Sequence, residues 1–174
     1  MKITLNTEEI QTAVKYQKDR RQYAIDHNLK HLGNIKKIPT NVDQFSVMAE
    51  IATAKYLGVE PIMELGVYHT PDMYYHGVPL DVKASFGHYA FAVRPVSIET
   101  LPANTLVPYC TGASFYQPPD SIEVDVIGVI SHKKVKRECF LSDFNQPERD
   151  EAYKVYLHQL YNMDKFVDYV GGLK

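Results

Sequence analysis

The periodicity of the apolar residues changes near residue 62, and this change constrains the fold more than any other feature of the sequence. Before this point, apolar residues recur three and four positions apart, as in helices. After it, short runs of alternating apolar and polar residues are separated by turn residues, as in strands. A further helix is predicted for residues 149–170. We therefore expect an α/β (α+β) fold with a central mixed β-sheet flanked by helices.

Two helices are predicted before the strands. The first covers residues 6–32 and begins at Asn6, with acidic residues in the first turn, where the helix dipole favours them. The second covers residues 40–57 and is followed by Gly58, a typical residue for ending a helix. Glu50 lies at the edge of its apolar stripe, which consists of Val42, Phe45, Ala49, Ala52 and Tyr56.

The strands predicted after residue 62 differ in length and clarity. A turn at His76–Gly77 connects two of them, the segment 132–137 is interpreted as a basic turn, and the proline-rich span 101–119 is not assigned. With 174 residues, we expect one domain, 1–174, in which the two terminal helices pack on a core formed by residues 40–145. The predicted strands are residues 63–69, 72–75, 78–85, 90–93, 122–131 and 139–144.

One strand combines an apolar face with a chemically reactive one. Side chains alternate between the two faces of a strand, so Asp81, Lys83 and Ser85 share one face. The hairpin through Gly77 should bring Asp72 alongside Asp81. The opposite face, which should point into the core, carries Leu80, Val82 and Ala84.

Two neighbouring carboxylates repel each other, and a bound cation relieves that repulsion. Oxygen ligands favour a hard ion, so Mg²⁺ or Mn²⁺ is the expected occupant between Asp72 and Asp81. Such an ion can polarise a phosphodiester and activate water, and Lys83 can orient that water or neutralise charge on the phosphate. Glu50 can add a ligand from the preceding helix. The alternative is a hairpin with a surface ion pair between Asp81 and Lys83.

These residues resemble a known superfamily. Pro71-Asp72 and Asp81-Val82-Lys83 match the motif of the PD-(D/E)xK nucleases, and the segment 49–58 is similar to the first core helix of that superfamily, which includes small phage-encoded nucleases. The resemblance covers residues 42–131. It implies a restriction-endonuclease-like αβββαβ core, with Asp72 and Asp81 as metal ligands, Lys83 as the catalytic lysine and Glu50 as an accessory acidic residue. The Val82 carbonyl is a further ligand that it suggests. The helix expected after the third strand is hard to find in residues 101–119.

The substrate contacts are predicted from position and charge. Ser85 and Arg94 lie just beyond the motif. The formal net charge of −2 gives no overall attraction to nucleic acid, so basic residues must gather locally. The basic run could supply that attraction if it lies beside the cleft, and otherwise it is a solvated turn. Its residues are Lys133, Lys134, Lys136 and Arg137.

The sequence thus predicts a Mg²⁺-dependent deoxyribonuclease that acts on DNA. Two alternatives stay open: an inactive nuclease-fold module that binds nucleic acid or protein, and cleavage of RNA. Endonuclease, exonuclease and junction resolvase are not distinguished, and a homodimer is one open arrangement. The sequence shows no apolar run long enough to span a membrane, and Cys110 and Cys139 fit two buried thiols in a reducing compartment. A cytoplasmic location is therefore expected.

Overall fold

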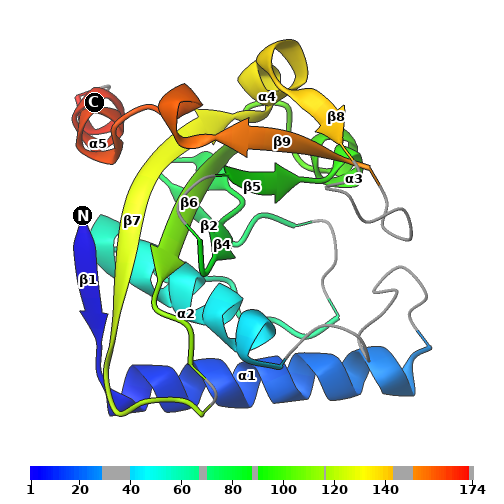
Figure 1. Ribbon diagram of the computed structural model, residues 1–174, viewed down its shortest axis with the longest axis vertical. Helices are drawn as coiled ribbons and strands as arrows, with labels where there is room; N and C mark the ends of the chain where they lie inside the picture. Colours follow the sequence, from blue (N-terminus) through cyan, green and yellow to red (C-terminus); the bar gives the residue numbers. More distant parts are fainter. Residues whose placement is uncertain (29–39, 67–69, 88–89, 116, 143–150, 173–174) are drawn as a thin grey trace.

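The computed structural model describes residues 1–28, 40–66, 70–87, 90–115, 117–142 and 151–172. The chain forms a curled, mixed β-sheet flanked by helices, with a smaller sheet on its other side (Figure 1). The larger sheet has six strands in the order β1-β7-β6-β3-β2, with β4 also paired to β6. Its strands are β1 (Lys2–Leu5), β2 (Met73–Tyr75), β3 (Val78–Leu80), β4 (Lys83–Ser85), β6 (Leu106–Gly112) and β7 (Ile122–Ser131).

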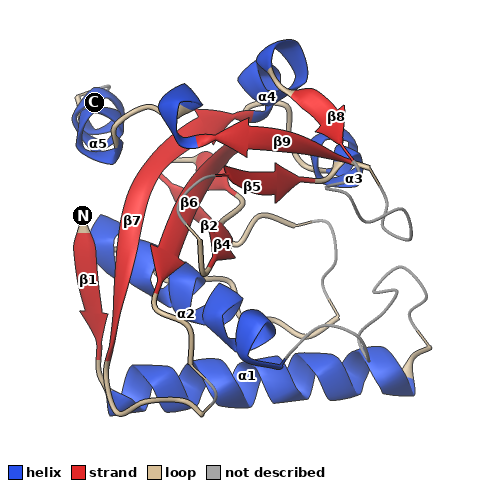
Figure 2. Cartoon of the chain, in the orientation of Figure 1, coloured by secondary structure: helices blue, strands red, loops and turns tan. Residues whose placement is uncertain are grey.

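The smaller sheet has three antiparallel strands in the order β5-β9-β8. These strands are β5 (Ala90–Val93), β8 (Phe140–Ser142) and β9 (Ala152–Tyr156), and they are red in Figure 2. The helices are α1 (Thr7–Asp26), α2 (Thr40–Leu57), α3 (Pro95–Thr100), α4 (His132–Glu138) and α5 (Met163–Gly171), with a short 3₁₀ turn η2 (Leu157–Gln159). No described helix is both long and apolar enough to cross a membrane.

The first two helices follow the sequence signals closely. Asn6 caps α1, because its side chain accepts a hydrogen bond from the Glu9 backbone amide while the Glu9 side chain returns one to Asn6. Helix α1 ends at Asp26, so the prediction of a helix over 6–32 is too long at residues 27–28, which form a turn in which Asn28 has a φ of 49°. Residues 29–32 of that predicted helix lie outside the described residues. Helix α2 has the predicted bounds, and Gly58 follows it with a φ of 66°.

Two separate cores hold the layers together. The helix-side core lies between the larger sheet and α1, α2 and α5, and it includes Phe45, Met48, Leu80, Val124 and Phe166. The second core lies between the larger and smaller sheets, and it includes Phe91, Val107, Tyr109, Val135 and Val155. The larger sheet is therefore buried on both faces at β6 and β7, the two neighbouring strands that contribute to both cores.

The predicted strand 78–85 is present but interrupted. Residues 78–80 and 83–85 form β3 and β4, and both pair in parallel with β6. Asp81 and Val82 form the break between them. The alternation still holds across the break, since Leu80, Val82 and Ala84 face the helix-side core as predicted.

Three other strands are as expected: 72–75 is represented by β2, while 90–93 and 122–131 match β5 and β7. Of the predicted strand 139–144, β8 is present, and residues 143–144 lie outside the described part. The prediction for 63–69 is wrong for residues 63–66, which form coil and a turn, and residues 67–69 lie outside the described part.

The prediction of a helix at 149–170 is wrong over its described first half. Residues 152–156 form β9, which pairs with β5 on one side and β8 on the other, and only residues 163–171 are helical. Tyrosines and valine in 153–156 suit a strand, and two neighbouring strands outweigh a local helical spacing. The basic segment 132–137 is also not a turn: it forms α4, capped by Ser131.

The span 101–119 contains β6, the strand that borders both β4 and β7. No α-helix is described within 101–119; the short helix α3 ends just before this span, after β5 of the smaller sheet. The mixed α/β architecture is therefore as predicted, with an additional sheet that the sequence pattern did not indicate.

Candidate functional site

The β2–β3 hairpin places Asp72 and Asp81 at the same end of two paired strands. Met73 lies opposite Leu80, so the residues just outside this pair, Asp72 and Asp81, are neighbours. The Asp72 backbone amide donates to the Leu80 carbonyl at 2.8 Å, and the Val82 backbone amide donates to Asp72 Oδ2 at 2.6 Å. The predicted approach of the two acidic residues is therefore present in the fold.

Lys83 extends toward Asp81 from the start of β4. Its Nζ forms an ion pair with Asp81 Oδ1, and the Asp81 residue is only 7% exposed. This pair is therefore not the surface ion pair considered as the alternative. Burial works against the charged form of Asp81, but Lys83 and then His132 outweigh it and hold the pKa of Asp81 below its usual range.

Glu50 enters the same region from α2 and is 6% exposed. Burial raises its pKa to about 8, and the negative charge of Asp72 adds to this effect. For Asp72, burial and the charge of Asp81 raise the pKa to about 6. The carboxylates thus perturb one another's pKa values: Asp72 and Asp81 raise that of Glu50, and Asp81 raises that of Asp72. Burial lowers the pKa of the neighbouring Lys83 ammonium, but the charges of Asp81 and Asp72 outweigh this effect and raise it.

The donor set suits a hard divalent cation, although the carboxylates are partly engaged with other groups. Carboxylate oxygens are the ligands that Mg²⁺ and Mn²⁺ prefer. Asp81 Oδ1, however, faces Lys83, and Asp72 Oδ2 faces the Val82 amide. Within the described residues, no three His, Cys, Asp or Glu side chains are already gathered to hold a metal ion. A cation shared by these carboxylates would require side-chain movement.

The two predicted substrate contacts beyond the motif differ in position. Ser85 is engaged within the protein: its Oγ lies 2.6 Å from Tyr109 Oη and donates to the Gly87 carbonyl at 3.0 Å. Arg94 is exposed and directly follows β5 of the smaller sheet, as the N-cap residue of α3. The Val82 carbonyl stays a predicted metal ligand. The Val82 backbone amide donates its hydrogen bond to Asp72.

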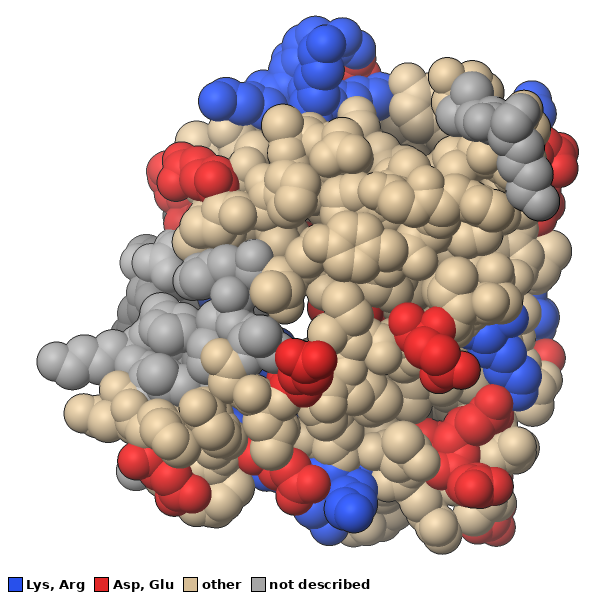
Figure 3. Space-filling model, turned by 180° about the vertical axis from the view of Figure 1, so that it is seen from behind, with Lys and Arg blue, Asp and Glu red and all other residues tan. Residues whose placement is uncertain are grey.

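The basic residues of α4 fall into two groups. Lys133, Lys136 and Arg137 are exposed, and they contribute to the blue surface at the top of Figure 3, where α4 lies in Figure 1. Arg137 is paired with Glu138, its neighbour. Lys134 instead points inward, as described next.

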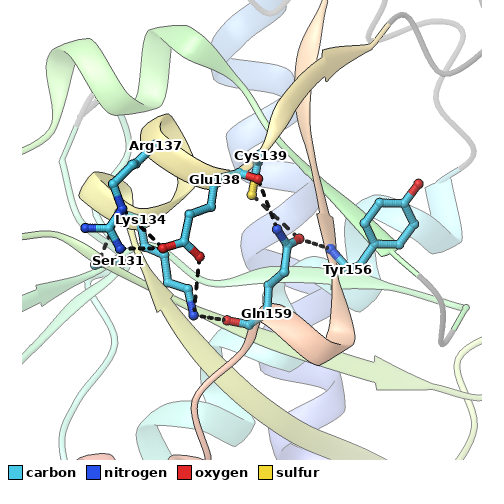
Figure 4. Close-up of polar contacts among 7 residues, drawn as sticks. All are labelled: Ser131, Lys134, Arg137, Glu138, Cys139, Tyr156 and Gln159. Atoms are coloured by element: carbon cyan, nitrogen blue, oxygen red, sulfur yellow. Dashed lines mark hydrogen bonds and ion pairs between the residues drawn. The ribbon is translucent and has the colours of Figure 1, made fainter.

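Lys134 connects α4 to the segment that follows β9. Its Nζ donates to the Gln159 carbonyl at 2.9 Å and lies 3.7 Å from a Glu138 carboxylate oxygen (Figure 4). The same Nζ lies 4.1 Å from the centre of the Tyr161 ring. Gln159 also accepts from the Tyr156 backbone amide at 2.8 Å. Of the four predicted substrate contacts on α4, Lys134 therefore has a structural role.

Two residues near the acidic group were not selected from the sequence. His132, the first residue of α4, has Nε2 3.9 Å from Asp81 Oδ2. Arg20 on α1 has Nη1 4.0 Å from Glu50 Oε1, and its side chain is 46% exposed. Arg20 belongs to a visible basic stretch on the first helix, which was a usable signal. His132 carried no signal, because its position depends on how β7 ends.

Comparisons of this chain with protein-family models, with curated protein sequences and with solved structures give no significant match. Its function must therefore be inferred from its own residues.

Proposed function

We propose that this protein is a metal-dependent nuclease that hydrolyses phosphodiester bonds in DNA. The observation that carries the proposal is the convergence of three mutually perturbing carboxylates with one ammonium group, drawn from α2, the β2–β3 hairpin and β4. Perturbed carboxylates that gather around a lysine are more frequent at catalytic sites than on ordinary surfaces. The residues are Glu50, Asp72, Asp81 and Lys83.

The order of elements supports a restriction-endonuclease-like core. Helix α2 is followed by the antiparallel β2–β3 hairpin and then by β4, β5, α3 and β6, and β4 runs parallel to β6. This is the αβββαβ order implied by the resemblance, if β3 and β4 are counted as one strand and β5 as the third. The departure is that β5 joins the smaller sheet.

In the proposed mechanism, Asp72 and Asp81 would hold a Mg²⁺ or Mn²⁺ ion, with Glu50 binding it directly or through water. The bound ion would polarise the phosphodiester and lower the pKa of the attacking water. Lys83 would orient that water or neutralise charge that develops on the phosphate. A divalent cation held near Glu50 and Asp72 would also lower their raised pKa values, so that both side chains would be ionised near neutral pH.

The Lys83–Asp81 ion pair has a defined place in this proposal. Without a divalent cation, the ammonium group compensates the buried charge of Asp81. When the cation binds, Lys83 would release Oδ1 and turn toward the substrate. Metal binding and the freeing of the catalytic lysine would thus be one coupled event.

The same ion pair also favours the alternative, an inactive nuclease-fold module that binds nucleic acid or protein. If Lys83 permanently neutralises Asp81, the acidic group needs no metal and serves only to stabilise the fold. The two functions differ in one measurable property, the affinity of the folded protein for Mg²⁺ or Mn²⁺.

The test is to incubate the purified protein with linear, circular and branched DNA, and with RNA, in the presence of each ion. The wild-type protein should cleave at least one DNA form, and Asp81→Asn and Lys83→Met should each reduce the rate by 100-fold or more, on the order expected for removal of a catalytic group. A matched control is the exposed cross-strand pair Lys2–Glu123, 3.0 Å apart on β1 and β7. Lys2→Met and Glu123→Gln should leave cleavage unchanged.

Absence of cleavage together with absence of metal binding would exclude the nuclease and leave the binding module. Cleavage of RNA alone would retain the chemistry and correct the substrate. The DNA form that is cut separates endonuclease, exonuclease and junction resolvase, and light scattering of the same sample shows whether the protein is a monomer or a homodimer.

A further inference from the structure

Buried polar atoms without partners are concentrated beside the candidate site. In the described part of the chain, five buried side-chain atoms have no hydrogen-bond partner, and four of them are on Asp81, Thr105 and His132. A buried polar atom without a partner is destabilising, so such a cluster indicates an interaction that forms when the groups move slightly or when a ligand is present.

The strand pairing explains why His132 lies next to Asp81. Leu106 on β6 pairs with Leu80 on one side and with Ser131 on the other. Asp81 and His132 directly follow these two partners in the chain. Their backbone amides are also anchored to β6 or the residue before it: Asp81 donates to the Leu106 carbonyl at 2.9 Å, and His132 donates to the Thr105 carbonyl at 3.1 Å.

The His132 side chain is almost completely enclosed, with 2% of the residue exposed. Its Nε2 lies 3.9 Å from Asp81 Oδ2, which is beyond hydrogen-bond length, and neither atom has another partner. A displacement of roughly 1 Å would close this gap to an ordinary N–H···O bond. Since Asp81 Oδ1 is held by Lys83, Oδ2 is the oxygen that His132 can fix.

We infer that His132 is a positioning residue: its Nε2–H donates to Asp81 Oδ2 and fixes the carboxylate so that Oδ1 faces Lys83 or, in its place, a divalent cation. The effect of His132 on a bound metal rests on the proposed nuclease function. The hydrogen bond between His132 and Asp81 does not depend on that function. Partners that orient a ligating carboxylate change metal affinity or activity by about 10- to 100-fold when removed.

The first experiment examines the contact in the metal-free wild-type protein. Proton–nitrogen NMR of the imidazole rings identifies the His132 signals as those missing from His132→Gln, out of seven histidines. The expected result is a slowly exchanging proton on Nε2, with Nδ1 unprotonated, and a shift of this signal in Asp81→Asn. A ring protonated only on Nδ1, or a signal indifferent to Asp81→Asn, would overturn the inference whether or not the protein is a nuclease.

The second experiment measures Mn²⁺ affinity by calorimetry in His132→Leu, which has no donor, and His132→Gln, whose amide can replace the Nε2–H. We expect the dissociation constant to rise about 10-fold or more in the leucine variant and to recover most of the way in the glutamine variant. In cleavage assays, kcat should fall in the leucine variant while KM for DNA stays near the wild-type value. The exposed His158→Gln is the matched control and should change neither quantity.

A purely structural role for His132 would lower the melting temperature without changing the Mn²⁺ affinity of the folded protein, and that result would refute the inference. If His132→Leu does not fold, the glutamine variant and the NMR signal still decide. If the wild-type protein binds no Mn²⁺ at all, the proposed function fails and the positioning role for a metal fails with it. If the wild type binds Mn²⁺ and His132→Leu binds it equally well, only the role of His132 is lost.

Discussion

Asp72 Oδ2 accepts a 2.6 Å hydrogen bond from the backbone amide of Val82, the residue that follows Asp81. This bond spans the break between β3 and β4, where Asp81 and Val82 lack regular strand pairing. The Asp72 carboxylate thus has two tasks in the proposed site: it would bind a metal, and it also fixes the backbone that presents Asp81 and Lys83.

Replacement of Asp72 should separate these tasks. Asp72→Ala leaves the Val82 amide without its acceptor and should lower the free energy of unfolding by about 1–3 kcal/mol. Asp72→Asn keeps a carbonyl acceptor and should lower it less, while both variants lose cleavage. Urea denaturation measures the free energy of unfolding of each variant, and the comparison holds if the slope of that free energy against urea concentration is the same in both. Equal stability of the two variants would show that the Asp72–Val82 bond is not important for this turn.

The raised pKa of Glu50 predicts an unusual dependence of stability on pH. Its pKa is raised to about 8 in the folded protein, mainly by burial, from an ordinary value of 4.5. Between these values the folded state binds more protons than the unfolded state, so the metal-free protein should lose stability as pH rises from about 5 to 8. Asp72, raised to about 6, contributes in the same direction over the lower part of this range.

Chemical denaturation at several pH values tests this expectation. Glu50→Gln should flatten the decline, and saturating Mg²⁺ should oppose it in the wild type, because the ion stabilises the charged carboxylates. The exposed Glu123→Gln provides the control. A wild-type stability that rises steadily from pH 5 to 8 would contradict the raised pKa values.

The two groups of basic residues on α4 should behave differently. Lys134→Met removes contacts with Gln159, Glu138 and the Tyr161 ring, and it should destabilise the fold by about 1–2 kcal/mol. The double variant Lys133→Met and Lys136→Met should leave stability within about 0.5 kcal/mol, because both side chains are exposed.

DNA binding over a range of salt concentrations tests whether the surface of α4 meets the substrate. The double variant should reduce the slope of log K against log salt by about 0.9 for each phosphate contact that is lost. An unchanged slope would mean that α4 carries a solvated basic surface away from the DNA.

Besides Lys83, Arg20 is a second basic residue that lies beside the acidic group. Its guanidinium is half exposed and 4.0 Å from Glu50, a position from which it can bind a substrate phosphate. Arg20→Met should weaken DNA binding about 10-fold, since a hydrogen bond to a charged group contributes roughly 1.5–3 kcal/mol. Lys18→Met, an exposed change on the same helix, is the matched control. Equal DNA affinity of the two variants would remove Arg20 from the proposed site.

Substitution of Gly128 tests how closely the C-terminal segment packs on β7. A Cβ at this position would lie 2.6 Å from the Tyr161 carbonyl oxygen and 3.0 Å from Leu160 Cβ. Gly128→Ala should therefore cost about 1–3 kcal/mol of stability. Gly171→Ala, at the end of α5 with nothing within 4 Å of the added Cβ, should be neutral or slightly stabilising. Thermal unfolding compares the two, and an unaffected Gly128→Ala would contradict the close approach.

Local chemistry in the sequence was sufficient to predict the parts of the site that are near one another in the chain. The turn at His76–Gly77, with φ values of 47° and 78°, returns the hairpin on itself and brings Asp72 beside Asp81. Strand alternation placed Leu80 and Val82 in the core. Residue preferences also predicted α1, α2 and β7, because capping groups and long apolar patterns act over a few residues.

Only the tertiary structure decided which distant segments meet. Residues 153–156 did not form the predicted helix, because β9 gains hydrogen bonds on both sides from β5 and β8. His132 reaches Asp81 through the pairing of β6 with both β3 and β7. A sequence records which side chains can form a strand or a cap, but the choice among competing partners depends on burial and hydrogen bonding between segments far apart in the chain.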